Sequence, residues 1–169
     1  MFKSKNRLYI AYGSNLNIKQ MSERCPTAKV IGVSALKGWR LIFRGGSMGA
    51  VATVERCHGS IVPIMIWQLQ PHDEAALDRY EGWPHLYRKE ALRVKLNGKS
   101  VDAMIYIMNE NRPYGSPSPS YFNTIRDGYI DAGFDISILQ KSTFDSLIES
   151  SKGRGKHDDG CGFNPIKFR

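Results

Sequence analysis

The stretch "IAYGSNLNIKQM" (residues 10–21) joins an apolar run to a segment that reads as a helix start. Residues 7–12, "RLYIAY", have the β-branched and aromatic content typical of a strand, and residues 17–25 predict a short helix. A strand that feeds a helix through Gly-Ser-Asn leaves the first helix N–H groups unpaired, and such a loop suits a carboxylate or phosphate. The alternative is an ordinary capped turn, and the loop by itself does not decide between the two.

The segments after this loop read mostly as strands. We expect strands at 29–43, as one bent strand or two, and at 49–57, 60–69, 86–96 and 100–108. Asn97-Gly98 predicts a tight hairpin turn between the last two, because both residues tolerate a positive φ. Pro63 removes a backbone donor, so we expect an edge position or a β-bulge there.

Helices are fewer and irregularly spaced. They are expected at 71–82 and 118–133, where Gly82 and Gly133 suit the C-terminal caps and Ser118 suits an N-cap, and a weak helix is expected from Ser142. The chain therefore lacks the strict β-α-β rhythm of a parallel sheet. The pattern predicts an α+β fold, a small, mixed, mostly antiparallel β-barrel with flanking helices.

The length and composition limit the domain organisation. A chain of 169 residues, 41% hydrophobic and 24% charged, is typical of one globular domain. We expect this domain at residues 1–140, followed at 141–169 by an extension with a weak helix and a polar, Gly-rich tail. No apolar stretch approaches the roughly 18 to 20 residues of a membrane span. The cysteines, three in number and widely spaced, do not suggest a disulfide framework, so a cytoplasmic location is expected.

Charge gives little direct information about a partner. A net charge of +8 admits nucleic acid or an acidic small molecule. The basic residues are scattered, with no run longer than two, which argues against nucleic acid as the main partner. Neither Cys57-His58 nor "KHDDGCG" (156–162) has the paired spacing of a zinc site, so no metal is expected.

A carboxyl suited to acid–base chemistry is predicted in "LDRYEGWPHLY" (residues 77–87). Glu81 falls at a helix C-terminus, where the helix dipole disfavours an anion, and neighbouring aromatic side chains would remove water from it. Both effects raise the pKa of the carboxyl toward neutrality, as general acid–base catalysis requires. The alternative is a solvated glutamate at a helix end. Asp78, on the same helix face, is interpreted as a surface or capping residue.

Three segments together, "AYGSNL", "ALDRYEGWPHLY" and "PSPSYFNTIRDGYIDAG", resemble in order and spacing the gamma-glutamylcyclotransferase-like superfamily. The resemblance covers about residues 8–134. It implies a small mixed barrel with one pocket. It also implies a reaction in which the α-amine of a γ-glutamyl group attacks its own γ-carbonyl, releasing 5-oxoproline and an amine or amino acid. No cofactor or metal is implied, and the expected partner is a small γ-glutamyl substrate.

The same resemblance implies roles for individual residues. Glu81 corresponds to the catalytic glutamate, and Tyr87 and Tyr121 correspond to pocket tyrosines. The loop expected to hold the glutamyl group consists of Tyr12, Gly13, Ser14, Asn15 and Leu16. The chain departs from the family pattern at Pro63 and in "FDISILQ" (134–140), which lacks a tyrosine found in several members, so the leaving-group side of the pocket is not predicted.

Two other readings of the sequence stay open at this point. The first is a catalytically silent module that binds a small carboxylated metabolite in the same pocket. The second is a basic nucleic-acid-binding domain.

The "YGSNL" form of the loop resembles the general and γ-glutamylamine branches of the superfamily more than the glutathione-specific branch. Neither the natural substrate nor the oligomeric state follows from the sequence.

Overall fold

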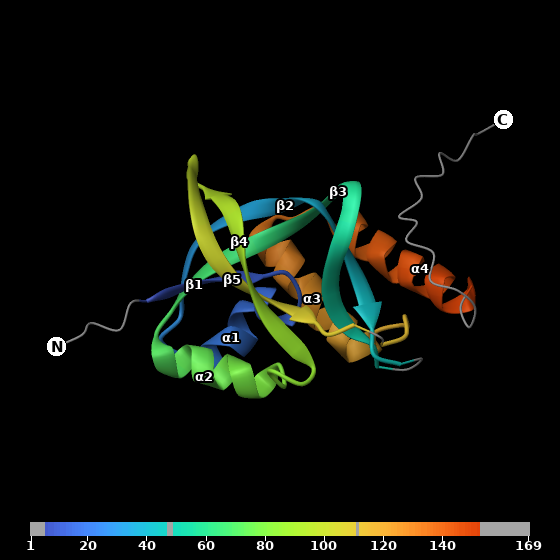
Figure 1. Cartoon of the computed structure of the whole chain (residues 1–169), viewed down its shortest axis with the longest axis horizontal. Coiled ribbons are helices and arrows are strands. Elements are labelled where there is room, and N and C mark those ends of the chain that lie inside the picture. Colours follow the sequence, from blue (N-terminus) through green and yellow to red (C-terminus); the bar gives the residue numbers. More distant parts are fainter. Residues whose placement is uncertain (1–5, 47–48, 111, 153–169) are drawn as a thin grey trace.

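The structure is a computed structural model, and it describes residues 6–46, 49–110 and 112–152. Strands and helices alternate irregularly along this part of the chain (Figure 1). In chain order the elements are β1 (Arg7–Ala11), the 3-10 helix η1 (Ser14–Leu16), α1 (Ile18–Arg24), β2 (Lys29–Arg44), β3 (Val51–Leu69), α2 (Pro71–Tyr80), β4 (Tyr87–Leu96), β5 (Lys99–Met108), α3 (Pro119–Ala132) and α4 (Ile136–Lys152). None of these helices is long and apolar enough to cross a membrane.

The strands form one mixed sheet with the order β2-β3-β1-β5-β4. β1 and β5 pair in parallel and the other neighbours pair antiparallel, which confirms the predicted mostly antiparallel α+β fold. Within the described residues, β2 and β4 form no ladder with each other, so the sheet is strongly curled rather than closed by hydrogen bonds as a full barrel is. Its edges still approach closely, since a Cβ added at Gly32 on β2 would lie 2.5 Å from Leu96 Cδ1 on β4.

The expectation of two strands at 49–57 and 60–69 is wrong, because one continuous strand, β3, runs from Val51 to Leu69. The pairing of β3 with β2 continues on both sides of an irregularity where Gly59 has a φ of +82°. β2 is likewise one strand, with register shifts between Val30 and Gly32 and between Lys37 and Trp39. Pro63 pairs with Ala35 of β2 without a bulge, and it lies beyond Met65, where the ladder with β1 ends. No β1 partner therefore needs its missing N–H.

Several predicted turns and caps are confirmed. Asn97 and Gly98 have φ values of 50° and 80° between β4 and β5. The Ser118 side chain accepts a hydrogen bond from the Tyr121 N–H at the start of α3, and Gly133 ends that helix in the left-handed conformation. Gly82, with a φ of 63°, directly follows Glu81, the C-cap residue of α2.

The expectation that the last helix begins at Ser142 is wrong, because α4 begins at Ile136. Asp135 provides the start signal: its Oδ1 accepts a hydrogen bond from the Ser137 N–H at 3.0 Å. The helix crosses residue 140, the predicted end of the domain, and Ser146 Oγ accepts a hydrogen bond from the Phe43 N–H of β2 at 2.9 Å. The predicted polar tail lies, from residue 153, outside the described residues.

The loop after β1 is held between the sheet and α3. A Cβ added at Gly128 of α3 would lie 2.7 Å from Leu16 Cβ, so this glycine allows the helix to approach the loop closely. Asn17 Nδ2 donates to the Thr124 carbonyl of α3 at 3.1 Å. These contacts hold the 3-10 helix η1 against α3.

Candidate active site

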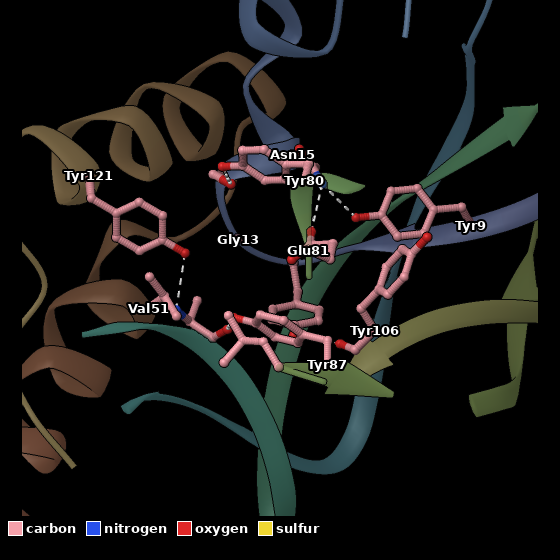
Figure 2. A pocket seen from close by; sticks show the side chains of 13 residues that line it. Tyr9, Gly13, Asn15, Val51, Tyr80, Glu81, Tyr87, Tyr106 and Tyr121 are labelled. Carbon is pink, nitrogen blue, oxygen red and sulfur yellow. Dashed lines mark hydrogen bonds between the residues drawn. The ribbon is translucent and has the colours of Figure 1, made fainter. Parts of the chain in front are cut away.

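A cavity of about 240 Å³ lies where the loop after β1 meets the end of α2, the strands β3, β4 and β5, and the start of α3. Figure 2 shows its side chains converging from these elements. The lining residues are Tyr9, Tyr12, Gly13, Ser14, Asn15, Val51, Ala52, Tyr80, Glu81, Leu86, Tyr87, Tyr106 and Tyr121. The fold thus brings together all the residues predicted for the site except Leu16.

Leu16 has a different position from the other loop residues. Its side chain is fully buried and packs against Gly128 of α3 instead of lining the cavity. It therefore anchors the loop from behind.

Glu81 directs its carboxyl into the centre of the cavity (Figure 2). Its backbone N–H donates to the Leu77 carbonyl at 2.8 Å, so the last turn of α2 fixes where the side chain begins. The residue as a whole is half-buried, but its carboxyl faces inward, and burial raises its pKa to about 7. The charge of Arg24 and a 3.1 Å hydrogen bond from Asn15 Nδ2 act in the opposite direction. Near neutral pH the carboxyl is therefore populated in both protonation states.

The sequence suggested that the loop leads straight into an α-helix, but in the structure a 3-10 helix, η1, comes before α1. The Leu16 N–H donates to the Gly13 carbonyl and the Asn17 N–H to the Ser14 carbonyl, both at 3.0 Å, and these two bonds form η1. The helix α1 then begins with Asn17 as its N-cap. In the part of the chain that the structure describes, the N–H groups of Ser14 and Asn15 donate no hydrogen bond. They are free to donate to a ligand.

Gly13 is required for close packing rather than for an unusual φ. A Cβ added there would lie 3.1 Å from the Cβ of Ala52 on β3 and 3.8 Å from the Tyr121 hydroxyl. The glycine thus lets the loop backbone approach β3 at the edge of the cavity.

Two predicted pocket tyrosines bind the backbone of Ala52 in complementary ways. The Tyr87 hydroxyl donates to the Ala52 carbonyl at 2.6 Å, whereas the Tyr121 hydroxyl accepts from the Ala52 N–H at 3.0 Å. Tyr87 therefore offers a lone pair to the cavity, and the O–H of Tyr121 is left as a donor. The O–H of Tyr12 is already used within the protein, since it donates to the Tyr106 carbonyl at 2.6 Å.

Three further tyrosines line the cavity without having been predicted as site residues. The Tyr9 hydroxyl accepts from Asn15 Nδ2 at 2.9 Å, and the Tyr80 hydroxyl lies 3.0 Å from Ser14 Oγ. The Tyr106 hydroxyl donates to Asp78, which Lys89 also contacts at 2.7 Å. Asp78, interpreted from the sequence as a surface or capping residue, thus orients a cavity side chain.

The signals for these three tyrosines differ. Tyr80 is next to Glu81 in the sequence. Tyr9 and Tyr106 have no local signal, because they meet through the non-local parallel pairing of β1 with β5. Their rings form an edge-to-face contact with centroids 5.8 Å apart.

The chain is similar to known proteins both in sequence and in structure. Residues 9–123 match the family model described as "Gamma-glutamyl cyclotransferase, AIG2-like". The chain is 29% identical to a gamma-glutamylcyclotransferase of Mus musculus over 161 residues, which cover 90% of this chain and 84% of the relative. It is 29% identical to the Homo sapiens protein of the same name over 144 residues, covering 79% and 76% of the two chains.

A solved structure named gamma-glutamyl cyclotransferase superposes with a TM-score of 0.70 at 27% sequence identity. The match covers 92% of this chain and 95% of the other. The matched family segment contains Glu81, the loop after β1 and Tyr121. The chain belongs to the gamma-glutamyl cyclotransferase, AIG2-like family.

Proposed function

We propose that the protein is a cyclotransferase that converts a γ-glutamyl amine, peptide or amino acid to 5-oxoproline and a free amine, with Glu81 as general acid and base. The observation that carries the proposal is the Glu81 carboxyl, which lies in the cavity with a pKa of about 7 beside the free N–H groups of Ser14 and Asn15. Family membership and the names of the relatives support the same reaction class.

The proton transfers follow from the reaction. The Glu81 carboxylate accepts a proton from the substrate α-ammonium, and the freed amine attacks the γ-carbonyl carbon to form the new C–N bond. Glu81 then donates a proton to the leaving nitrogen as its bond to that carbon breaks. The attacking nitrogen loses its second proton as the ring forms, and the released amine takes up a second proton. In net terms two protons move from the α-nitrogen to the leaving nitrogen, and the carboxyl returns to its starting state. A pKa of about 7 allows both transfers near neutral pH.

The cavity also suits a γ-glutamyl zwitterion. The substrate carboxylate needs hydrogen-bond donors, which the loop N–H groups and the O–H groups of Tyr9 and Tyr121 provide. The substrate ammonium needs acceptors, which Glu81 and Tyr87 provide. A small cavity that holds the amine close to its own carbonyl lowers the barrier to ring closure by proximity.

A substrate panel tests this function. The protein is incubated with γ-glutamyl amines, peptides and amino acids, and 5-oxoproline is followed, with Glu81→Gln as the matched variant. We expect turnover of at least one class and its loss in the variant. Binding without turnover of any compound would instead indicate a binding module, and salt-dependent nucleic-acid binding by an inert protein would indicate a nucleic-acid-binding domain.

We also propose a domain division and a cellular location for the protein. Residues 1–140 form the catalytic domain and 141–169 an extension of it, and the protein acts in the cytoplasm. Truncation after residue 140 tests the first, although loss of the Phe43–Ser146 hydrogen bond is then expected to lower stability.

A further inference from the structure

Arg24, at the end of α1, lies behind the wall of the cavity rather than in it. Its guanidinium carbon stacks 3.4 Å from the centroid of the ring of Tyr80, a residue that lines the cavity. Its Nη1 donates to Asn15 Oδ1, and its Nη2 lies 3.4 Å from Gln20 Oε1. One half-buried arginine therefore contacts two cavity residues from outside.

The contact with Asn15 fixes which end of that amide faces Glu81. An asparagine side chain has one oxygen that accepts and one NH₂ group that donates, whereas a guanidinium only donates. Because Arg24 occupies the oxygen, the NH₂ group turns the other way, toward Glu81 Oε1 at 3.1 Å and the Tyr9 hydroxyl at 2.9 Å. A flipped amide would place its oxygen against the Glu81 carboxylate and its NH₂ against the guanidinium.

Arg24 is also the charged group that acts on Glu81. The other titratable groups around the cavity are tyrosines from β1, the loop after it, α2, β4, β5 and α3, namely Tyr9, Tyr12, Tyr80, Tyr87, Tyr106 and Tyr121. Tyrosines are neutral at pH 7. Burial raises the pKa of Glu81, and the Arg24 charge is the largest influence that lowers it.

We propose that Arg24 is a positioning residue for the cyclisation: it holds the Asn15 amide with its NH₂ group toward Glu81 and brings a positive charge next to the amide that contacts that carboxyl. The inference rests on the proposed function. It adds a residue outside the cavity on which the acid–base group depends. Arg24 touches no substrate in this account, and its effect passes through Asn15, Tyr80 and the electrostatic field at Glu81.

Two substitutions separate the charge from the fork geometry. Arg24→Met keeps an unbranched apolar stem but removes the charge and both donors. Arg24→Lys keeps the charge without the planar fork. Arg93→Met is the control, because Arg93 is exposed on β4 and pairs only with exposed Asp102 in the described residues.

The first readout is the titration of the Glu81 carboxyl in the ligand-free protein, followed by ¹³C NMR and identified by its absence in Glu81→Gln. We expect its midpoint to move to higher pH in Arg24→Met by more than in Arg93→Met, and to stay near the wild-type value in Arg24→Lys. An unchanged midpoint in Arg24→Met would overturn the proposed charge effect. This readout needs no turnover, so it tests Arg24 even if no γ-glutamyl compound proves to be a substrate.

The second readout is 5-oxoproline formation as a function of pH. Arg24→Met is expected to lower kcat at pH 7 about tenfold with a smaller change in KM, a part of the roughly 10²–10⁴-fold that a positioned acid–base group contributes. The acidic limb of the pH profile of kcat should move to higher pH in Arg24→Met. In Arg24→Lys the midpoint of the acidic limb is expected to stay at the wild-type pH, while kcat is lowered.

Each remaining outcome decides the proposal. Wild-type kcat in Arg24→Lys would overturn the role in orienting the Asn15 amide. If Arg24→Met does not fold, Arg24→Lys carries the test by the same criterion. Active wild-type protein with no effect in any Arg24 variant would refute this inference alone, whereas an inert wild-type protein would refute the proposed function.

Discussion

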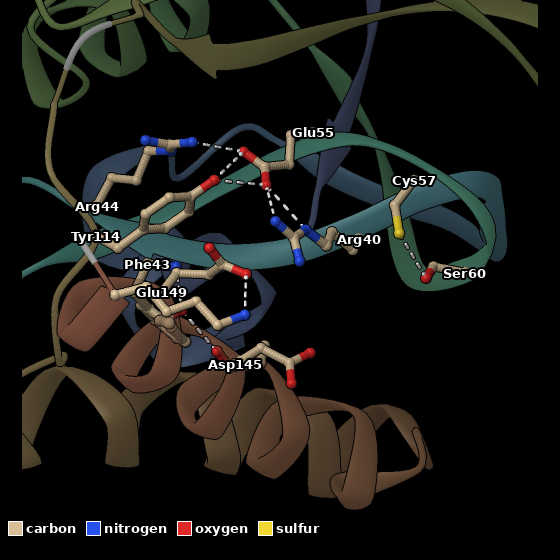
Figure 3. Close-up of polar contacts among 12 residues, drawn as sticks. Arg40, Phe43, Arg44, Glu55, Cys57, Ser60, Tyr114, Asp145 and Glu149 are labelled. Carbon is tan, nitrogen blue, oxygen red and sulfur yellow. Dashed lines mark hydrogen bonds and ion pairs between the residues drawn. The ribbon is translucent and has the colours of Figure 1, made fainter. Parts of the chain in front are cut away.

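Glu81 and Glu55 are both partly removed from water, yet their carboxyls have opposite surroundings. Glu55, on β3, accepts hydrogen bonds from Arg40 and Arg44 of β2 and from the Tyr114 hydroxyl (Figure 3). Burial by itself would raise its pKa, but the hydrogen bonds and charges of the two arginines outweigh that effect and lower it. Glu81 has one amide donor and an arginine that does not touch it, so burial prevails and raises the pKa to about 7.

The difference separates a structural carboxylate, Glu55, from Glu81, the carboxyl that we propose to be reactive. The Glu55 cluster joins β2, β3 and the segment before α3, because Arg44 also stacks on the Tyr114 ring and donates to the Arg112 carbonyl. That segment leads to Tyr121 in the cavity. A carboxylate saturated with cationic donors stays ionised and holds elements together. A carboxyl with few donors keeps a proton that it can transfer.

The largest expected effect comes from exchanging each carboxyl for an amide. Glu81→Gln should lower turnover by roughly 10²–10⁴-fold, because the amide neither accepts nor returns the proton. Glu55→Gln should leave turnover per folded molecule close to that of the wild type. Equal losses in both variants would mean that Glu81 acts only through the fold.

The pH dependence of stability should also distinguish Glu81. Its pKa rises from an ordinary value of 4.5 to about 7 on folding, so the native state favours the protonated form. This contribution is fully present below pH 4.5 and is lost as pH rises through 7, by roughly 3 kcal/mol. Denaturant unfolding at pH 5 and pH 8 should therefore show the wild type losing stability relative to Glu81→Gln. Parallel pH profiles would contradict the buried, protonated carboxyl.

Glu55 should show the opposite sign. Its lowered pKa gives stability that is present above its ordinary value near 4.5 and is lost as pH falls. Glu55→Gln leaves Arg40 and Arg44 without their carboxylate and should cost about 2 kcal/mol at pH 7, less than a fully buried pair because the site is partly exposed. Glu90→Gln, which breaks the more exposed pair with Arg88, is the control and should cost less than about 1 kcal/mol. A similar cost for both would remove the distinction.

The smallest expected effect concerns the loop. Gly13→Ala places a Cβ 3.1 Å from Ala52 Cβ, so the loop must shift by a few tenths of an ångström away from β3. We expect a stability loss of about 1 kcal/mol and a raised KM. The double variant Gly13→Ala/Ala52→Gly removes the opposing Cβ and should restore KM. A wild-type KM in the single variant would show that the approach of the loop to β3 does not matter for binding.

These contrasts also show what the sequence could predict. Glu81, Gly82 and the aromatic residues beside them lie within one helix end, so their pattern is visible locally. Gly133 and Asn97-Gly98 were predictable for the same reason, because the required φ depends on neighbouring residues alone. The start of α4 was also a local signal, the cap at Asp135, which the assignment to Ser142 overlooked.

The remaining features depend on contacts between distant segments. Tyr9 and Tyr106 meet only because β1 pairs with β5, and Arg24 reaches Asn15 and Tyr80 only because α1 packs near α2. The continuity of β3 likewise depends on its ladder with β2. No spacing within one segment encodes these contacts, so the positions of Tyr9, Tyr106 and Arg24 around the site could not be derived from the sequence alone.

We propose that a single buried carboxyl with a pKa near neutrality performs the proton transfers. The most direct test is the pH dependence of kcat/KM for 5-oxoproline formation by the wild-type protein. We expect an acidic limb with a midpoint near 7, below which activity falls tenfold for each pH unit as Glu81 becomes protonated. Activity that stays constant down to pH 5 would contradict it, because a carboxyl of ordinary pKa, or none, would then be the base.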